Sequence, residues 1–242
     1  MVGFLIWRAA GRPAVELRRE VLLGRPFLAA EVLRRPGTPE FLLRRRVRRA
    51  AGALLQGGVR QAALPEGFSY EKELGALRRV STLPTRRALA PEWVDEALVR
   101  RGLPAADSRV AVCAGEVTAE VERAVRALSR RHRYVLLEAS GGEALCRALR
   151  REGGVSLVLR PDEKRLAEAE ALVLFWDRPG LPRRNPVVLS LYEETAPLPP
   201  LRWDLEAALP PGTDRAMGLA ALWSAGALGR EGTALFPAAD RT

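Results

Sequence analysis

From residue 109 to residue 191, short apolar runs alternate with segments of helical periodicity. After the first run, Val121, Val125 and Leu128 form one apolar stripe at the spacing of a helix. Nearly continuous apolar strands separated by helices predict an α/β fold with a parallel sheet covered on both faces. With right-handed crossovers, we expect the Rossmann-like strand order 3-2-1-4-5. The expected strands cover residues 109–114, 134–138, 155–159, 172–175 and 187–191.

The pattern before residue 105 is different. Three apolar runs are separated by two Gly-Arg-Pro turns, which favours an antiparallel β-meander at the start of the chain. A helix is expected next, with Thr38 as its N-cap and Gly57-Gly58 at its end. The expected elements of this part are strands over 4–7, 14–22, 27–33 and 59–64, a helix over 70–77 capped by Ser69, and a helix over 91–102.

A proline-containing connection at residues 104–108 is the expected boundary between two lobes. We therefore predict a smaller basic α/β lobe at residues 1–104, a Rossmann-like lobe at residues 105–195, and a C-terminal helical tail at residues 196–242 that packs on the lobes. Within the tail we expect a helix over 203–209, a helix that Thr213 caps and that runs to about residue 225, and an edge strand over 229–236.

Composition narrows the class of protein. The chain has 242 residues, of which 48% are hydrophobic and 28% charged, as in ordinary globular proteins. Its longest nearly apolar stretch, residues 216–228, is shorter than the roughly 20 residues that cross a bilayer. Residues 1–10 lack the features of a secretion signal, and two cysteines make no disulfide framework. We therefore expect a cytoplasmic protein without a membrane partner.

The net charge of +10 comes from one part of the chain. Residues 1–104 hold 20 basic and 10 acidic side chains, whereas residues 105–242 hold 19 of each. A cationic helix face binds nucleic acid through its phosphates, and the expected first helix carries the exposed positions Arg44, Arg45, Arg48 and Arg49. A solvated helix face is the alternative, and GC-rich coding also accounts for an excess of arginine.

The segment 113–118, with the sequence CAGEVT, follows the first strand of the Rossmann-like lobe. Aligned with the dinucleotide motif G-x-G-x-x-G, it keeps only Gly115, because Cys113 stands at the first glycine and Thr118 at the third. The first glycine permits the tight turn and the third permits close packing of the helix on the strand. Thr118 is also expected to cap the helix, and Glu116 would repel a phosphate. The motif therefore argues against a conventional pyrophosphate site.

Other polar side chains follow the same end of the predicted sheet. Glu138 ends the second strand, at about the distance past the glycine motif where an acid binds ribose. The alternative interpretation is that the Glu138 carboxylate faces solvent or pairs with Arg133 or Arg147. Ligands of open α/β sheets lie beyond the carboxyl ends of the strands. The candidate cofactor-binding residues are accordingly Gly115, Glu116, Thr118, Glu138, Ser140, Trp176 and Asp177.

No residue is predicted to be catalytic or to bind a metal. The single histidine, His132, lies in an arginine-rich run whose position predicts a helix end near the surface, and it cannot build a multi-histidine zinc site. The sequence also lacks the G-x-S-x-G elbow of a serine hydrolase.

Residues 91–177, with the partial motif at 113–118, resemble the NAD(P)-binding Rossmann domain of shikimate-dehydrogenase-like and glutamyl-tRNA-reductase-like proteins. In those proteins a helix leads into the first strand, as residues 91–102 do here. The resemblance implies NAD(P) as the candidate cofactor.

Three hypotheses follow from the sequence. In the first, a degenerate Rossmann-like domain serves as a scaffold or binds a small ligand without acting as a standard dehydrogenase. In the second, the protein is an NAD(P)-dependent reductase with a non-standard dinucleotide site. In the third, it associates with nucleic acid through its arginine-rich N-terminal lobe. The sequence leaves open the ligand, the oligomeric state and whether any reaction is catalysed.

Overall fold

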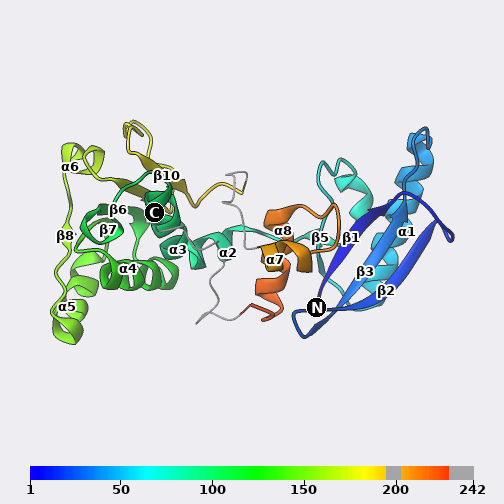
Figure 1. Cartoon of the computed structure of the whole chain (residues 1–242), viewed down its shortest axis with the longest axis horizontal. Helices are drawn as coiled ribbons and strands as arrows, with labels where there is room; N and C mark the ends of the chain where they lie inside the picture. The colour runs from blue at the N-terminus through cyan, green and yellow to red at the C-terminus, as the bar shows by residue number, and fades with distance from the viewer. Residues whose placement is uncertain (195–202, 229–242) are drawn as a thin grey trace. The chain divides into compact units, whose positions relative to one another are not determined.

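Two five-stranded sheets organise the computed structural model, which describes residues 1–194 and 203–228 (Figure 1). Each sheet belongs to one of two compact units. The described part of the first unit is Met1–Thr85 with residues 203–228, and that of the second is residues 86–194. The edge strand expected over 229–236 lies outside the described residues. Among those residues, no helix combines the length and the apolar character that a membrane crossing requires.

The second unit holds a fully parallel sheet in the order β10-β9-β6-β7-β8, which confirms the predicted order 3-2-1-4-5. The strands are β6 (Arg109–Glu116), β7 (Tyr134–Ser140), β8 (Val158–Leu159), β9 (Ala171–Leu174) and β10 (Val187–Ser190). The parallel arrangement follows from the sequence, because β6 and β9 are apolar on both faces and each sheet face needs a helical cover.

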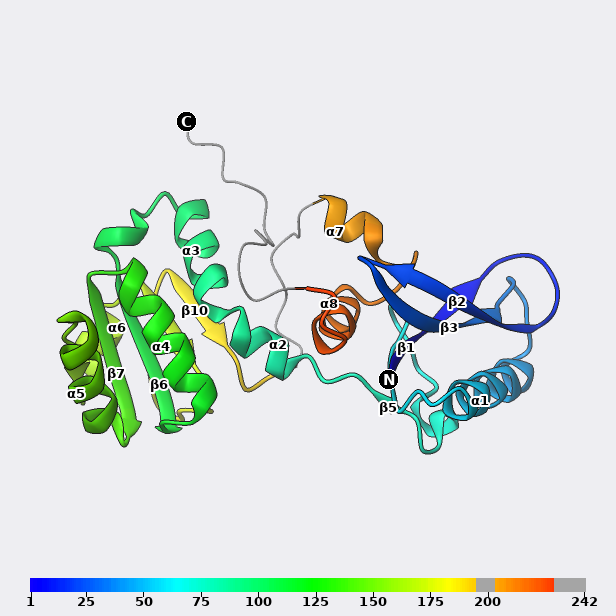
Figure 2. The ribbon, with the colours of Figure 1, turned by 90° about the horizontal axis from the view of Figure 1, so that it is seen from below.

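Helices cover both faces of this sheet (Figure 2). Helices α3 (Ala90–Arg100) and α4 (Ala119–Arg131) contact each other, and α5 (Gly142–Gly153) contacts β7. On the other face, Leu166 of α6 (Glu163–Ala167) and Leu181 pack against Ala111 and Cys113 of β6. A short helix α2 (Leu83–Ala88) and the 3₁₀ segment η2 (Ala105–Asp107) precede β6. The carboxyl ends of β6, β7 and β9 therefore meet at one edge, where the candidate residues lie.

The sheet of the first unit has the order β2-β3-β1-β4-β5. Its strands are β1 (Val2–Arg8), β2 (Val15–Leu22), β3 (Arg25–Leu33), β4 (Gln61–Ala63) and β5 (Arg78–Arg79). The predicted meander forms only between β2 and β3, which are antiparallel, because β1 pairs in parallel with β3 and β4. Burial explains the difference. The apolar β1 is buried along most of its length and takes the centre, whereas β2 carries four charged residues and takes the edge.

Helix α1 (Glu40–Gln56) covers one face of this sheet with Leu43, Val47, Ala50 and Leu54. Helix α8 (Arg215–Ser224) contacts β1 and β4, and α7 (Trp203–Ala208) precedes it. In place of the helix expected over 70–77 there is only the 3₁₀ segment η1 (Glu71–Leu74).

Two helix starts differ from the prediction by one residue. Pro39 is the N-cap position of α1, because the Thr38 hydroxyl closes a turn onto the backbone of Arg35 instead. In α8 the cap is Asp214, whose carboxylate accepts from the Met217 amide at 2.9 Å. In both cases the predicted threonine lies directly before the residue that begins the helix geometry.

His132 is buried, contrary to the surface position predicted for it. It ends α4, and its Nδ1 lies 2.5 Å from the Ala105 carbonyl oxygen. Its Nε2 lies 2.9 Å from the Asp95 carboxylate of α3, which also binds Arg131. The arginine-rich run therefore ties α4 to α3 and η2, and its histidine has a structural role.

Candidate functional site

Strand β6 runs through the place where a dinucleotide-binding fold has its glycine-rich turn. After a register shift that follows Cys113, Glu116 pairs with Ser140 of β7. The Val117 amide donates to the Ser140 carbonyl at 3.0 Å, and the Thr118 amide donates to the Glu116 carbonyl at 3.1 Å. Both amides are thus bonded within the protein and not directed at a ligand.

At the start of α4, a side chain of the protein also accepts a hydrogen bond from a backbone amide of the first helical turn. Thr118 is the N-cap, and its hydroxyl oxygen accepts from the Val121 amide at 3.3 Å, in agreement with the cap expected from the sequence. A phosphate at a helix N-terminus needs free amides and a favourable charge. Glu116, exposed at the end of β6, adds a negative charge beside this position.

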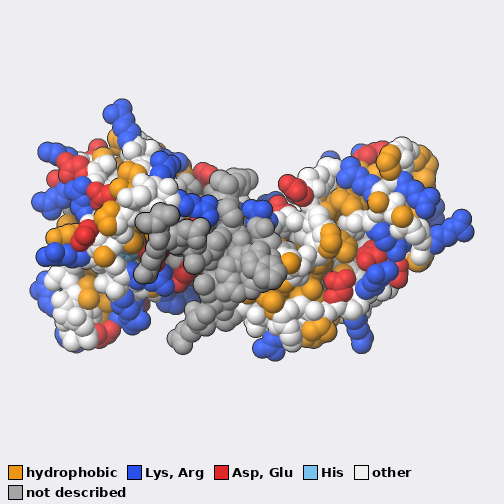
Figure 3. Space-filling model, viewed as in Figure 1, with side chains coloured by type: hydrophobic (Ala, Val, Ile, Leu, Met, Phe, Trp, Pro, Cys, Tyr) orange, Lys and Arg blue, Asp and Glu red, His pale blue; other side chains and the backbone are white. Residues whose placement is uncertain are grey.

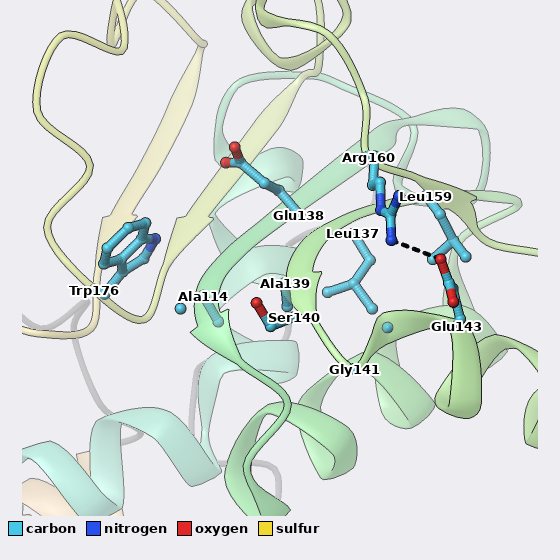
Figure 4. A pocket seen from close by; sticks show the side chains of 12 residues that line it. Ala114, Leu137, Glu138, Ala139, Ser140, Gly141, Glu143, Leu159, Arg160 and Trp176 are labelled. Atoms are coloured by element: carbon cyan, nitrogen blue, oxygen red, sulfur yellow. Dashed lines mark hydrogen bonds and ion pairs between the residues drawn. The ribbon is translucent and has the colours of Figure 1, made fainter.

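A pocket of about 480 Å³ lies at the carboxyl ends of β6 and β7 (Figure 4). It collects Gly115, Glu138, Ser140 and Trp176 from the candidate set. Glu116, Thr118 and Asp177 are not part of its wall: Asp177 instead pairs with Arg183 at 2.8 Å. The remaining lining residues are Ala114, Leu137, Ala139, Gly141, Gly142, Glu143, Leu159 and Arg160.

The indole of Trp176 forms one end of the pocket (Figure 4). Trp176 is 43% exposed, which is unusual for so large an apolar side chain. A Cβ added to Gly115 would lie 3.8 Å from the indole, so the side of this glycine that lacks a side chain faces the ring. The one glycine kept from the motif therefore faces a tryptophan.

Arg178 binds the carboxylate of Glu138, which is the acidic residue predicted from the sequence to bind ribose. Nε and Nη2 of Arg178 lie 3.0 to 3.3 Å from the two carboxylate oxygens. Hydrogen bonding to Glu138 raises the pKa of Arg178. From the sequence, Arg133 or Arg147 was expected as the ion-pair partner of Glu138, and Arg178 was not. The predicted topology could have indicated Arg178, because this residue follows β9, and the carboxyl ends of β7 and β9 lie at the same edge of the sheet.

The thiol of Cys113 lies next to this ion pair. Cys113 and Glu138 are register partners on β6 and β7. Burial, followed by the charge of Glu138, raises the pKa of Cys113 to about 12. The thiol therefore stays protonated at neutral pH and is not a nucleophile.

The far wall of the pocket is the start of α5. Gly141 has a φ of 82°, a left-handed conformation that glycine adopts readily, and Gly142 begins the helix. Nη2 of Arg160 lies 2.7 Å from the Glu143 carboxylate (Figure 4). Both side chains are largely exposed, so this ion pair is weak and opens easily.

The arginines of α1 divide into two groups. Arg44 pairs with Glu40 at 3.3 Å, and Arg46 donates to the Leu33 carbonyl at 2.6 Å. Within residues 1–194 and 203–228, Arg45, Arg48 and Arg49 have neither an ion pair nor a side-chain hydrogen bond. On the face displayed in Figure 3, basic side chains are spread over both units.

No group of three or more His, Cys, Asp or Glu side chains among the residues that the structure covers has the arrangement of a metal site.

No family model and no curated protein matches the chain. Solved structures that are similar to parts of this chain include L-tryptophan dehydrogenase from Nostoc punctiforme, with 12% identity and a TM-score of 0.34 over 68% of this chain and 50% of that one. Shikimate 5-dehydrogenase from Listeria monocytogenes, solved with shikimate and NAD, has 10% identity and a TM-score of 0.28 over 64% of this chain and 61% of that one. The chain thus matches about half to three fifths of these two proteins.

Proposed function

We propose that residues 86–194 form a Rossmann-like domain that binds a small ligand and does not carry out conventional dinucleotide-dependent hydride transfer. One observation carries the proposal. The amides of Val117, Thr118 and Val121, which lie in the turn and first helical turn where such folds bind a pyrophosphate, are all bonded to acceptors of the protein itself. To bind a dinucleotide in the usual way, the chain would have to break these bonds and accommodate Glu116 beside the phosphates.

The pocket fits a planar heteroaromatic ligand about the size of a nucleoside. Its volume of about 480 Å³ lies within the usual range for ligand sites. The exposed face of Trp176 offers stacking, and Ser140 and the first turn of α5 offer polar groups. Glu138 is neutralised by Arg178, which favours a ligand without net charge.

The chemistry of the pocket supports binding more than catalysis. Three titratable side chains line it: Arg178 holds Glu138 in a partly buried ion pair, and Glu143 and Arg160 form a weaker, exposed pair with each other. The neighbouring thiol of Cys113 keeps its proton. A general acid or base needs a pKa near the working pH and access to the substrate. The alternative, a reductase with a non-standard dinucleotide site, requires these pairs to open.

Calorimetric titration of the full chain tests the proposal. Adenosine, AMP, S-adenosylmethionine, NADH and NADPH serve as probes. We expect saturable binding of adenosine, weakened about tenfold or more by Trp176→Leu, since base stacking contributes roughly 1–3 kcal/mol. Trp223→Leu, in the first unit, is the matched control and should leave the affinity unchanged. Tight NADPH binding with turnover of a carbonyl substrate would favour the reductase, and no binding of any probe at about 1 mM would exclude the proposed ligand class.

A second candidate function is nucleic-acid binding through α1. It is favoured by Arg45, Arg48 and Arg49, which are exposed and without an ion pair in the described residues, and by Phe41, which is 68% exposed on the same helix. Affinity for a duplex or a single strand should fall steeply with salt, and replacing these three arginines with glutamine should flatten the dependence. Arg44→Gln, at a partnered position, is the control. Binding that does not change with salt would exclude this function.

A further inference from the structure

Strand β2 leaves a long backbone edge without a partner. It ends the sheet of the first unit, and no strand of the described residues pairs with its outer side. It has eight residues, whereas β5 and β8 at other sheet edges have two each and β10 has four. Proteins usually protect long edges, because unpaired amides and carbonyls are a template for a further strand.

The register with β3 shows which groups of β2 face outward. The pairing of Val15 with Val32 places Ala14 opposite Leu33, and the Leu33 amide donates to the Ala14 carbonyl at 2.9 Å. In an antiparallel pair, alternate residues bond to the neighbouring strand. The even-numbered residues of β2 therefore bond to β3, and the backbone groups of Leu17, Arg19 and Val21 point away from the sheet.

The outward residues also carry exposed apolar side chains. Leu17 is 42% exposed and Val21 is 72% exposed. Both share the sheet face of Val15, which is buried in the core beneath α1. On the opposite face, Arg18 lies next to Glu16 and Glu31, and Glu20 follows it by two residues.

We propose that β2 pairs in antiparallel fashion with β2 of a second copy of this chain, with Arg19 at the twofold axis. This register places Leu17 opposite Val21 of the second copy, and Val21 opposite its Leu17. On the other face it places Arg18 opposite Glu20 in both directions. The two sheets then form one continuous sheet across the axis, closed by backbone hydrogen bonds from residues 17, 19 and 21.

The sequence of β2 excludes the neighbouring registers. Only registers that place odd-numbered residues opposite one another join two outward backbones. Centring the pair on Arg18 would put Glu16 opposite Glu20 and Leu17 opposite Arg19, which combines like charges with an apolar-to-charged contact. Centring it on Leu17 would leave Val21 beyond the paired segment, and centring it on Glu20 would put Glu20 opposite itself and Arg19 opposite Val21. In the proposed register the unfavourable pairs are Arg19 with itself at the axis and Glu16 with Leu22 at the two ends of the paired segment.

Sedimentation of the full chain tests the association. A 26.5 kDa monomer should be in equilibrium with a species of twice that mass between about 1 and 300 µM, a range typical of small interfaces. Leu17→Lys and Val21→Lys should each weaken the dimer about tenfold or more, whereas Arg19→Thr should tighten it about threefold or more. Phe41→Lys changes an equally exposed apolar residue elsewhere in the unit and should have no effect. A monomer throughout the range, or a dimer that survives both lysine variants, contradicts the proposal.

Charge exchange tests the register. Arg18→Glu alone and Glu20→Arg alone each create two like-charge contacts across the axis and should be monomeric. An equal mixture of the two variants restores both opposite-charge contacts and should dimerise. Thermal melting of each variant checks the fold, because Arg18 also pairs with Glu16 and Glu31.

Cross-linking tests the same register through the distance between equivalent residues. Under mild oxidation Arg19→Cys should form a disulfide across the axis, because its two Cα atoms lie about 5.5 Å apart, whereas the two copies of Arg18→Cys lie diagonally at about 7–8 Å and should not. The native cysteines, Cys113 and Cys146, are buried and give the background. Efficient linkage at position 18, or none at position 19 in a sample that sediments as a dimer, contradicts the register.

Discussion

Arg178 binds both carboxylate oxygens of Glu138 across the carboxyl edge of the second sheet, with nitrogen-to-oxygen distances of 3.0 to 3.3 Å. Glu138 lies in β7, and Arg178 lies after the end of β9. Their ion pair fixes one wall of the pocket. Arg178 thereby binds the carboxylate that, in a conventional dinucleotide site, would bind the ribose. The site therefore depends on an arginine that lies outside the glycine motif.

The Glu138–Arg178 pair should stabilise the fold measurably. About a quarter of each side chain is exposed, and the contact is bidentate, so we expect a coupling of about 1 kcal/mol. The measurement is a double-mutant cycle with Glu138→Gln and Arg178→Gln, by urea unfolding. The exposed pair of Arg160 and Glu143 is the control and should couple by less. Equal couplings for the two pairs would contradict the account.

Removing the cap of α4 should destabilise the second unit. Thr118→Ala leaves the Val121 amide without its acceptor and should lower the free energy of unfolding by about 1 kcal/mol. Thr118→Ser keeps the hydroxyl oxygen and should lose much less. Equal losses in the two variants would show that the methyl group, and not the hydrogen bond, matters at this position.

Two glycines of the pocket should respond differently to alanine. Gly115 does not have a positive φ, and its added Cβ would meet Trp176 at an ordinary contact distance of 3.8 Å, so Gly115→Ala should fold with little change in Tm. Gly141 has a φ of 82°, so Gly141→Ala should lose about 1–2 kcal/mol of stability. Thermal melting compares them. A larger loss at Gly115 would show that the indole lies closer to its backbone than described.

Alkaline pH should destabilise the protein through Cys113. Burial raises the pKa of this thiol from 9.0 to about 12, so between these values the unfolded chain loses a proton that the folded chain keeps. Stability should therefore fall as the pH rises from 9 to 12, approaching about 1.4 kcal/mol per pH unit from this group. Burial also raises the pKa of Tyr70 and Tyr192, which act in the same direction. Cys113→Ala retains both tyrosines and should show a shallower fall. Parallel curves for the two proteins would contradict the burial of the thiol.

Hydrophobic periodicity was sufficient to predict the Rossmann-like sheet, including its strand order, because buried parallel strands leave a strong local pattern. It failed for the first three strands. The Gly-Arg-Pro turns indicated tight reversals, but the position of β1 beside β3 depends on burial of β1 on both faces. Such burial is a property of the whole unit, and adjacent turns do not encode it.

The candidate site shows the same division. The helix cap at Thr118 is a local feature that could be read directly from the sequence. The same is true of the two glycines that are missing from the motif. By contrast, Trp176 faces Gly115, and Arg178 pairs with Glu138. Each pair brings together residues that are far apart in the chain. The strand pattern predicted that Trp176 and Glu138 lie beyond the carboxyl ends of the strands, and both line the pocket. The same pattern does not single out Arg178 among the many arginines of the chain.

The central claim is that the pocket binds a small ligand while the amides after β6 remain bonded to the protein. Amide NMR of the full chain during titration with adenosine, and separately with NADPH, tests it most directly. The account predicts saturable shifts at Gly115, Ser140, Gly141 and Gly142, with the amides of Val117, Thr118 and Val121 unchanged. Saturable shifts of those last three amides with NADPH would show a working pyrophosphate site and contradict the account.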